Sequence, residues 1–124
     1  MDDEVKNLLR RAMKDLVTLE ITLFFQRHPD AVDSQDGLSK RLACEPEDLS
    51  PALDALAKEG IIDRSRLGDG RYEVFSLTPN QQLRSTLGRL SSYYHDDPAS
   101  RAEIIRHIIS NTEKSRQKIQ PSSL

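Results

Sequence analysis

The chain has 124 residues, a net charge of −2, 36% hydrophobic residues and 5% aromatic residues, with no tryptophan. A chain of this length builds one modest core, which leucine, isoleucine, valine and alanine must fill, as in packed helices. Charged residues of both signs make up 31% of the chain, and this near-neutral mixture argues against disorder. The balance also gives no long-range attraction to nucleic acid or to an acidic membrane, so any such binding depends on local clusters.

The composition also bears on metals, catalysis and location. The single cysteine, Cys44, excludes an internal disulfide and a cysteine-based zinc cage, and we interpret it as a small buried apolar group. The histidines (His28, His95 and His107) are scattered, so we expect no metal and no cofactor. No glycine-rich phosphate loop or catalytic constellation is present, and we expect no enzyme activity. No apolar run reaches the roughly 18 residues of a membrane span, and the acidic start differs from a signal peptide. We therefore expect a cytoplasmic protein that does not bind membranes.

The first half of the chain has the pattern of packed helices. Val5 to Arg27 contains neither glycine nor proline and has apolar residues at helical spacing, which fits one long helix or two in tandem. His28–Pro29 ends it, because the residue before proline resists helical geometry. Asp33–Ser34 then offers a capping oxygen for a short helix over about residues 35–43.

A third helix follows the turn Cys44–Pro46 and runs to Lys58–Glu59, where Gly60 closes it in the left-handed conformation. Pro51 would clash with the carbonyl group four residues back if this helix began at Pro46. We therefore expect it to begin near Asp48, with Asp48 as its cap. Its apolar residues at helical spacing form the buried stripe: Leu49, Ala52, Leu53, Leu56 and Ala57.

After Gly60 the hydrophobic period changes from about 3.6 to about 2. Residues 61–67 and 71–77 flank Gly68-Asp69-Gly70, and Asp-Gly is a strong signal of a two-residue hairpin turn. With Asp69–Gly70 as the turn, the cross-strand pairs are Arg66 with Glu73, Arg64 with Phe75, and Ile62 with Leu77. The hairpin then has an apolar base and a charged tip, which is typical of a ribbon rooted in the core.

Two more helices are expected after Thr78–Asn80, separated by a break at Asp96–Pro98. The first has a leucine stripe and the second an isoleucine patch around Ile104 to Ile109. Together with the N-terminal helix they have more apolar surface than one small domain covers. We therefore predict a homodimer built from the terminal helices.

The order of parts from Leu19 to Pro79 resembles the winged helix-turn-helix superfamily and is close in layout to the MarR-like and ArsR-like bacterial regulators. The matching segments are Asp33-Ser34, Leu38–Ala43, Pro46–Leu49, Leu53–Leu56, Gly60–Ile62 and the hairpin ending in Leu77-Thr78-Pro79. The resemblance implies a mainly α fold with a small β-hairpin. A winged helix-turn-helix domain (16–79) would carry additional N-terminal (1–15, dimerising) and C-terminal (80–118) helices and a flexible tail (119–124).

The resemblance also implies a DNA-binding transcriptional regulator that acts as a homodimer on double-stranded DNA. In such proteins the third helix enters the major groove, the second braces it, and the wing grips phosphates or the minor groove. Carried over to this chain, the candidate DNA contacts are Ser39, Lys40 and Arg41 on the second helix, Ser50, Pro51, Asp54 and Lys58 on the third, and Arg64, Arg66 and Arg71 on the wing.

The charge of the third helix favours an alternative. Glu45 to Glu59 holds five acidic residues against Lys58 alone, whereas phosphate contacts dominate affinity for DNA. Asp54 can accept a hydrogen bond from a cytosine amino group, and acids in the first turn also complement the helix dipole. The wing has three arginines against Asp63 and Asp69, although an Arg66–Glu73 pair would use part of that charge. The alternative is a winged-helix protein–protein interaction module whose acidic third helix faces a basic partner.

Overall fold

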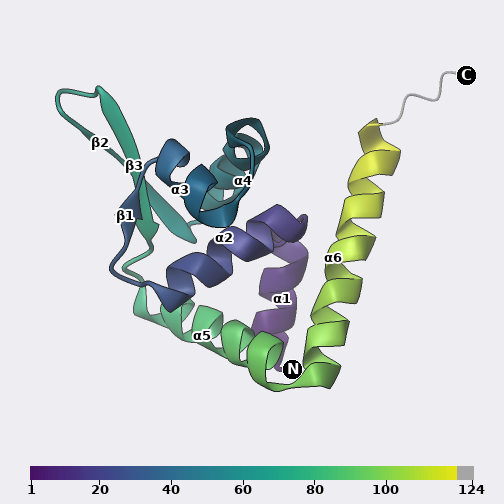
Figure 1. Cartoon of the computed structure of the whole chain (residues 1–124). Coiled ribbons are helices and arrows are strands. Elements are labelled where there is room, and N and C mark those ends of the chain that lie inside the picture. The colour runs from purple at the N-terminus through teal and green to yellow at the C-terminus, as the bar shows by residue number, and fades with distance from the viewer. Residues whose placement is uncertain (120–124) are drawn as a thin grey trace, which may run out of the picture.

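A computed structural model describes residues 1–119, and from residue 114 on it describes only the helical backbone. The described residues form six helices and three strands (Figure 1). In chain order these are α1 (Asp3–Ala12), α2 (Leu16–Arg27), β1 (Val32–Asp33), α3 (Gln35–Leu42), α4 (Pro46–Lys58), β2 (Ile62–Leu67), β3 (Tyr72–Leu77), α5 (Gln81–Asp96) and α6 (Pro98–Ile119). The predicted fold class, mainly α with a small β-hairpin, is confirmed. The expected flexible tail lies outside the described residues, apart from Ile119 at the end of α6.

Two helices in tandem occupy the N-terminal apolar segment. Asp15 separates them by starting α2 with a capping box: its carboxylate accepts a hydrogen bond from the Thr18 amide at 2.9 Å, and the Thr18 hydroxyl accepts one from the Asp15 amide at 3.2 Å. Such reciprocal caps satisfy two backbone donors that the helix leaves unpaired. The break between the helices is therefore determined locally, by Asp15 and the residue three positions after it.

The β2–β3 hairpin, called the wing from here on, has the register predicted from its turn. Asp69 and Gly70 both have positive φ, 58° and 85°, and the Arg71 amide donates to the Gly68 carbonyl at 3.1 Å. This is the geometry of a type I′ turn, whose twist matches that of the paired strands. All three predicted cross-strand pairs are present: Ile62–Leu77, Arg64–Phe75 and Arg66–Glu73.

A third strand, β1, was not expected from the sequence and completes the sheet in the order β1-β3-β2. Val32 pairs with Ser76 and Asp33 with Phe75, both antiparallel. A strand of two residues is too short to show an alternating pattern. This pairing holds Asp33 against the base of the wing. The next residue, Ser34, caps α3 by accepting a hydrogen bond from the Gly37 amide at 3.1 Å.

The end of α4 is fixed by a Schellman motif. Gly60 has a φ of 76°, and the Ile61 amide donates to the Leu56 carbonyl at 3.0 Å, which is the arrangement of such a helix end. The Ile61 carbonyl in turn accepts a hydrogen bond from the Thr78 amide at 3.0 Å. One residue therefore joins the end of α4, the start of β2 and the segment before α5.

The expected start of α4 near Asp48 is wrong. The helix begins at Pro46, and Pro51 lies inside it, beyond the first turn. Proline suits the first helical position because its fixed φ is already helical and no N–H is needed there. At Pro51 the missing N–H leaves the Glu47 carbonyl without its helical donor. Pro51 is exposed, so water can hydrate that carbonyl group.

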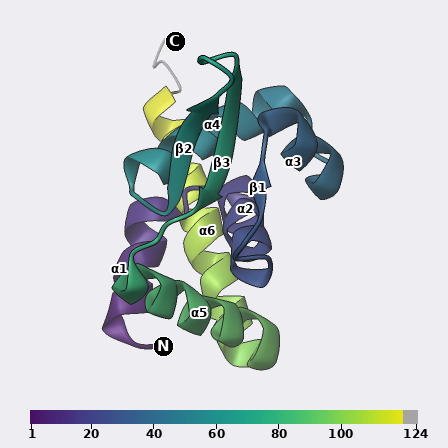
Figure 2. The same ribbon diagram turned by 90° about the vertical axis from the view of Figure 1, so that its left-hand side faces the viewer.

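The hydrophobic core lies between the two ends of the molecule. Figures 1 and 2 show α3, α4 and the wing at one end and α5 with the start of α6 at the other. The apolar face of α1 packs into this core, with Val5, Leu8 and Leu9 fully or almost fully buried. Part of the apolar helical surface that was expected to serve a dimer is thus covered within one chain. None of the described helices is long and apolar enough to cross a membrane.

Asp2 ties the start of α1 to α5. Its carboxylate caps α1 by accepting from the Val5 amide at 3.0 Å, and it also accepts from Arg89 Nε and the Tyr93 hydroxyl, each at 3.1 Å. The backbone hydrogen bond, followed by the bonds from these two side chains, holds the pKa of Asp2 below its usual value.

Candidate nucleic-acid interface

The outer side of α4 is open to solvent. The inner side packs its leucines into the core, and the predicted groove-facing residues lie on the outer side. There Pro51, Asp54 and Lys58 are exposed and Ser50 is half-buried. α2, α3 and β2 pack against the other sides of α4. In Figure 1 this helix shares one end of the molecule with the wing.

Arg64 and Asp54, both predicted DNA contacts, bind each other. The Arg64 guanidinium contacts the Asp54 carboxylate on α4, and its Nε lies 3.6 Å from Oε2 of Glu73. It also lies over the Phe75 ring, 5.4 Å from the ring centroid, a cation–π arrangement. Arg64 thus joins the wing to α4, and the carboxylate that would accept a cytosine amino group already has a partner.

The other wing arginines are more available. Arg66 Nη2 lies 3.9 Å from Glu73, the pair that the register predicted, but its side chain is 70% exposed. Arg71 is exposed, and none of the ion pairs between described residues includes it. Because Glu73 faces two of the arginines, it has to be counted with the wing. The three wing arginines are then balanced by three acids, Asp63, Asp69 and Glu73, and the wing has no net positive charge.

The three candidates on α3 have different environments. The Ser39 hydroxyl donates to the Cys44 carbonyl and so closes the turn between α3 and α4. Arg41 Nε lies 2.7 Å from Oδ2 of Asp33, although the Arg41 side chain remains 63% exposed. Lys40 is exposed, and no ion pair between described residues includes it. Of these three residues, Lys40 is the most available to an outside anion.

Two acids that anchor the arginines were not predicted as site residues. Asp33 holds Arg41, and Glu73 faces both Arg64 and Arg66. The predicted hairpin register indicated the contact of Glu73 with Arg66 but not its contact with Arg64. The sequence held no comparable signal for Asp33, because its position depends on the unforeseen strand β1.

Cys44 lies in the turn between α3 and α4 and is half-buried rather than fully buried. Desolvation, followed by the charges of Asp48, Glu20 and Glu45, raises the pKa of its thiol. A raised pKa keeps the thiol protonated at neutral pH, whereas reactive cysteines need the thiolate.

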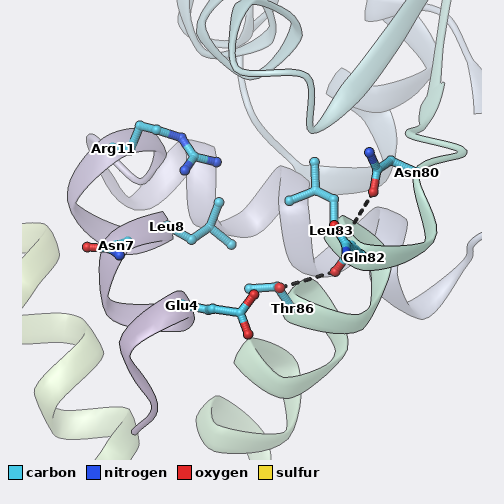
Figure 3. Close-up of a pocket in the computed structure, with 8 residues that line it drawn as sticks. All are labelled: Glu4, Asn7, Leu8, Arg11, Asn80, Gln82, Leu83 and Thr86. Carbon is cyan, nitrogen blue, oxygen red and sulfur yellow. Dashed lines mark hydrogen bonds between the residues drawn. The ribbon is translucent and has the colours of Figure 1, made fainter.

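A polar hollow of about 330 Å³ opens between α1 and the start of α5 (Figure 3). Its polar groups serve structural contacts. Arg11 Nε lies 2.7 Å from Oε1 of Glu59, the Thr86 hydroxyl donates to the Gln82 carbonyl at 3.1 Å, and Asn80 caps α5. No group of three or more histidine, cysteine or acidic side chains among the described residues is placed to hold a metal.

Solved structures with similar folds include two proteins from microorganisms. One is a possible transcriptional regulator from Methanosarcina mazei Go1, which is 17% identical with a TM-score of 0.54; the alignment covers 94% of this chain and 89% of that chain. The other is a mutant of ZitR from Lactococcus lactis, which is 14% identical with a TM-score of 0.53 over 82% of this chain and 72% of that chain. No protein-family model and no curated protein matches the chain. At such identities the likeness extends to the fold, which agrees with the winged-helix architecture.

Proposed function

We propose that the chain is a cytoplasmic DNA-binding transcriptional regulator of the winged-helix, MarR-like type, and that it acts as a homodimer without a catalytic role. One observation carries the proposal. The outer side of α4 and the wing lie at the same end of the molecule (Figure 1), exposed to solvent. A helix and a ribbon that enter neighbouring grooves of a duplex need this arrangement. One of the two similar structures is described as a possible transcriptional regulator, which supports the same class.

In this proposal the contacts divide between phosphates and bases. Lys40 on α3 and Arg66 and Arg71 on the wing bind phosphates, because they are exposed, whereas Arg41 and Arg64 are held by Asp33 and Asp54. Ser50 and Lys58 face the bases from α4. Phosphate contacts fix the register of the protein on the duplex, and base contacts specify its sequence. Ser39 contributes by holding the turn between α3 and α4.

The test is a titration of labelled duplex DNA at several salt concentrations, followed by fluorescence anisotropy. We expect micromolar or tighter binding at about 50 mM salt, with log K falling linearly against log salt concentration. Arg71→Ala, Arg66→Ala and Lys40→Ala each make this slope shallower by up to about 0.9, the value of one phosphate contact. Arg10→Ala, on the exposed side of α1, is the matched control and leaves the slope unchanged. Absence of binding at about 50 mM salt would refute the proposal.

A second function is favoured by the acids of α4. Glu47, Asp48 and Asp54 are exposed on this helix, and like charges repel DNA phosphates. A winged-helix module that binds a basic protein partner through α4 fits this surface. Capture of one defined protein from nuclease-treated native lysate, together with no binding to duplex DNA, would favour it. A capture from untreated lysate that returns DNA and no defined protein would exclude it.

A further inference from the structure

An apolar groove of about 600 Å³ lies between the start of α2 and α6. Leu16, Val17, Ile105, Ile108 and Ile109 supply its apolar lining. Leu16 is 48% exposed and Ile109 is 52% exposed, which is unusual for large apolar side chains in this molecule. Apolar patches of this kind on a soluble protein mark contact surfaces.

The groove is held in place by polar bonds along one side of α6. Asn111 Nδ2 donates to the Met13 carbonyl at 2.9 Å, and the Thr112 hydroxyl contacts the Lys14 carbonyl at 3.2 Å. These bonds fix the rotation of α6 against the junction of α1 and α2. As a result Ile105 and Ile109, one turn apart, form a fixed stripe beside Leu16.

The charges beside this stripe are complementary to those of an identical stripe. Arg106 and Glu113 are both exposed and lie two turns apart on the same side of α6, with Ile109 between them. When two identical helices pack antiparallel around a two-fold axis, residues at equal distances on either side of the axis face each other. With the axis beside Ile109, Arg106 faces the partner's Glu113, and the reverse contact forms as well. A parallel pairing would place arginine against arginine.

We propose that a second copy of this chain covers the groove by antiparallel pairing of α6. Ile109 of each copy enters the groove of the other beside Leu16, and Arg106 forms an ion pair with the partner's Glu113 on one side of the axis. This interface rests on the homodimer part of the proposed function and is independent of DNA binding. Such a contact leaves α4 and the wing of each copy free.

The test is sedimentation equilibrium of the full chain without DNA. Arg106→Glu and Glu113→Arg each raise the dimer dissociation constant about tenfold, because the lost ion pair occurs twice in a symmetric dimer. Mixing these two variants restores dimerisation, because the two copies then carry opposite charges at both contacts. The double variant restores it too. Glu47→Arg reverses an exposed charge on α4, outside the proposed interface, and leaves the constant unchanged.

The apolar contact at Ile109 is tested separately from the ion pair. Ile109→Asp gives a monomer with unchanged helical circular dichroism. A wild-type chain that stays monomeric at about 100 μM would exclude a second copy as the occupant of the groove. A wild-type dimer without rescue in the mixture would show that the copies meet through another face. Rescue in the mixture supports the interface whether or not the chain binds DNA, so failure of the regulator proposal is seen separately, in the duplex titration.

Discussion

Replacing Asp54 by asparagine tests whether its contact with Arg64 restrains DNA binding. In the free protein Arg64 lies between Asp54 on α4 and Glu73 on the wing, so nearby carboxylates compensate its charge. Asp54→Asn removes one negative charge from the surface proposed to face phosphates. The change keeps the size of the side chain and releases Arg64 from α4. Both effects favour the duplex, and we expect tighter binding.

The size of the gain follows from counterion release. One additional phosphate contact contributes a slope of about 0.9 in log K against log salt, which corresponds to roughly 15-fold at 50 mM salt and about fourfold at 200 mM. Glu73 still lies 3.6 Å from Arg64, so the gain at 50 mM should be about three- to tenfold. The Asp54 side chain is 63% exposed, and the free energy of unfolding should change by less than about 1 kcal/mol.

Anisotropy titration with a duplex of arbitrary sequence measures this gain. Asp96→Asn is the control, because it removes the same charge at the end of α5, away from α4 and the wing (Figure 1). Equal affinities of wild type and Asp54→Asn would refute the restraint, and so would an equal gain in Asp96→Asn. Weaker binding of Asp54→Asn would refute the restraint as well.

Four further predictions concern stability and reactivity. Ala43 has a φ of 51°, so Ala43→Gly should raise the free energy of unfolding by about 0.5–1 kcal/mol in urea denaturation. Gly60 has a φ of 76°, so Gly60→Ala should lower the free energy of unfolding by about 1 kcal/mol. A change of the opposite sign at either position would contradict the strain argument. The lowered pKa of Asp2 stabilises the fold above the unfolded-state pKa, and this contribution disappears as the pH falls through the lower folded-state pKa. Asp2→Asn keeps a capping oxygen but loses the charge facing Arg89, so its melting temperature should be below that of wild type at pH 7 and converge with it at about pH 2. An equal deficit at both pH values would contradict the charge argument. The thiol of Cys44, with its raised pKa, should react with a disulfide reagent several-fold more slowly than glutathione at pH 7.5, and at a comparable rate once the chain is unfolded in urea; fast reaction in the folded chain would indicate a stabilised thiolate.

The wing could be predicted from the sequence in detail because its determinants are local. Asp69–Gly70 selects the turn type, and the turn together with the period-2 pattern fixes which residues face each other. The start of α4 could not be predicted as well. Pro46 at the first helical position decided it, and packing of the buried stripe outweighed the cost of Pro51 inside the helix.

The availability of each candidate cation could not be predicted, because it depends on tertiary placement. Arg64 reaches Asp54 only because β2 packs against α4. Arg41 reaches Asp33 because β1 joins the sheet. Sequence patterns indicated which residue types lie on the exposed sides, but they did not show which of those charges already have partners.

The backbone bonds of Ile61 have a consequence for how the wing moves. Its amide group is bound to the end of α4, its carbonyl group is bound to Thr78, and its side chain is fully buried. The base of the wing therefore cannot move relative to α4 unless the last turn of α4 unwinds, whereas Gly70 at the tip of the wing is exposed. Amide hydrogen exchange should accordingly be slow at Ile61 and fast at Gly70. In the proposed complex with DNA, a wing that is fixed at its base and exposed at its tip would adjust to grooves of different width while α4 keeps its orientation.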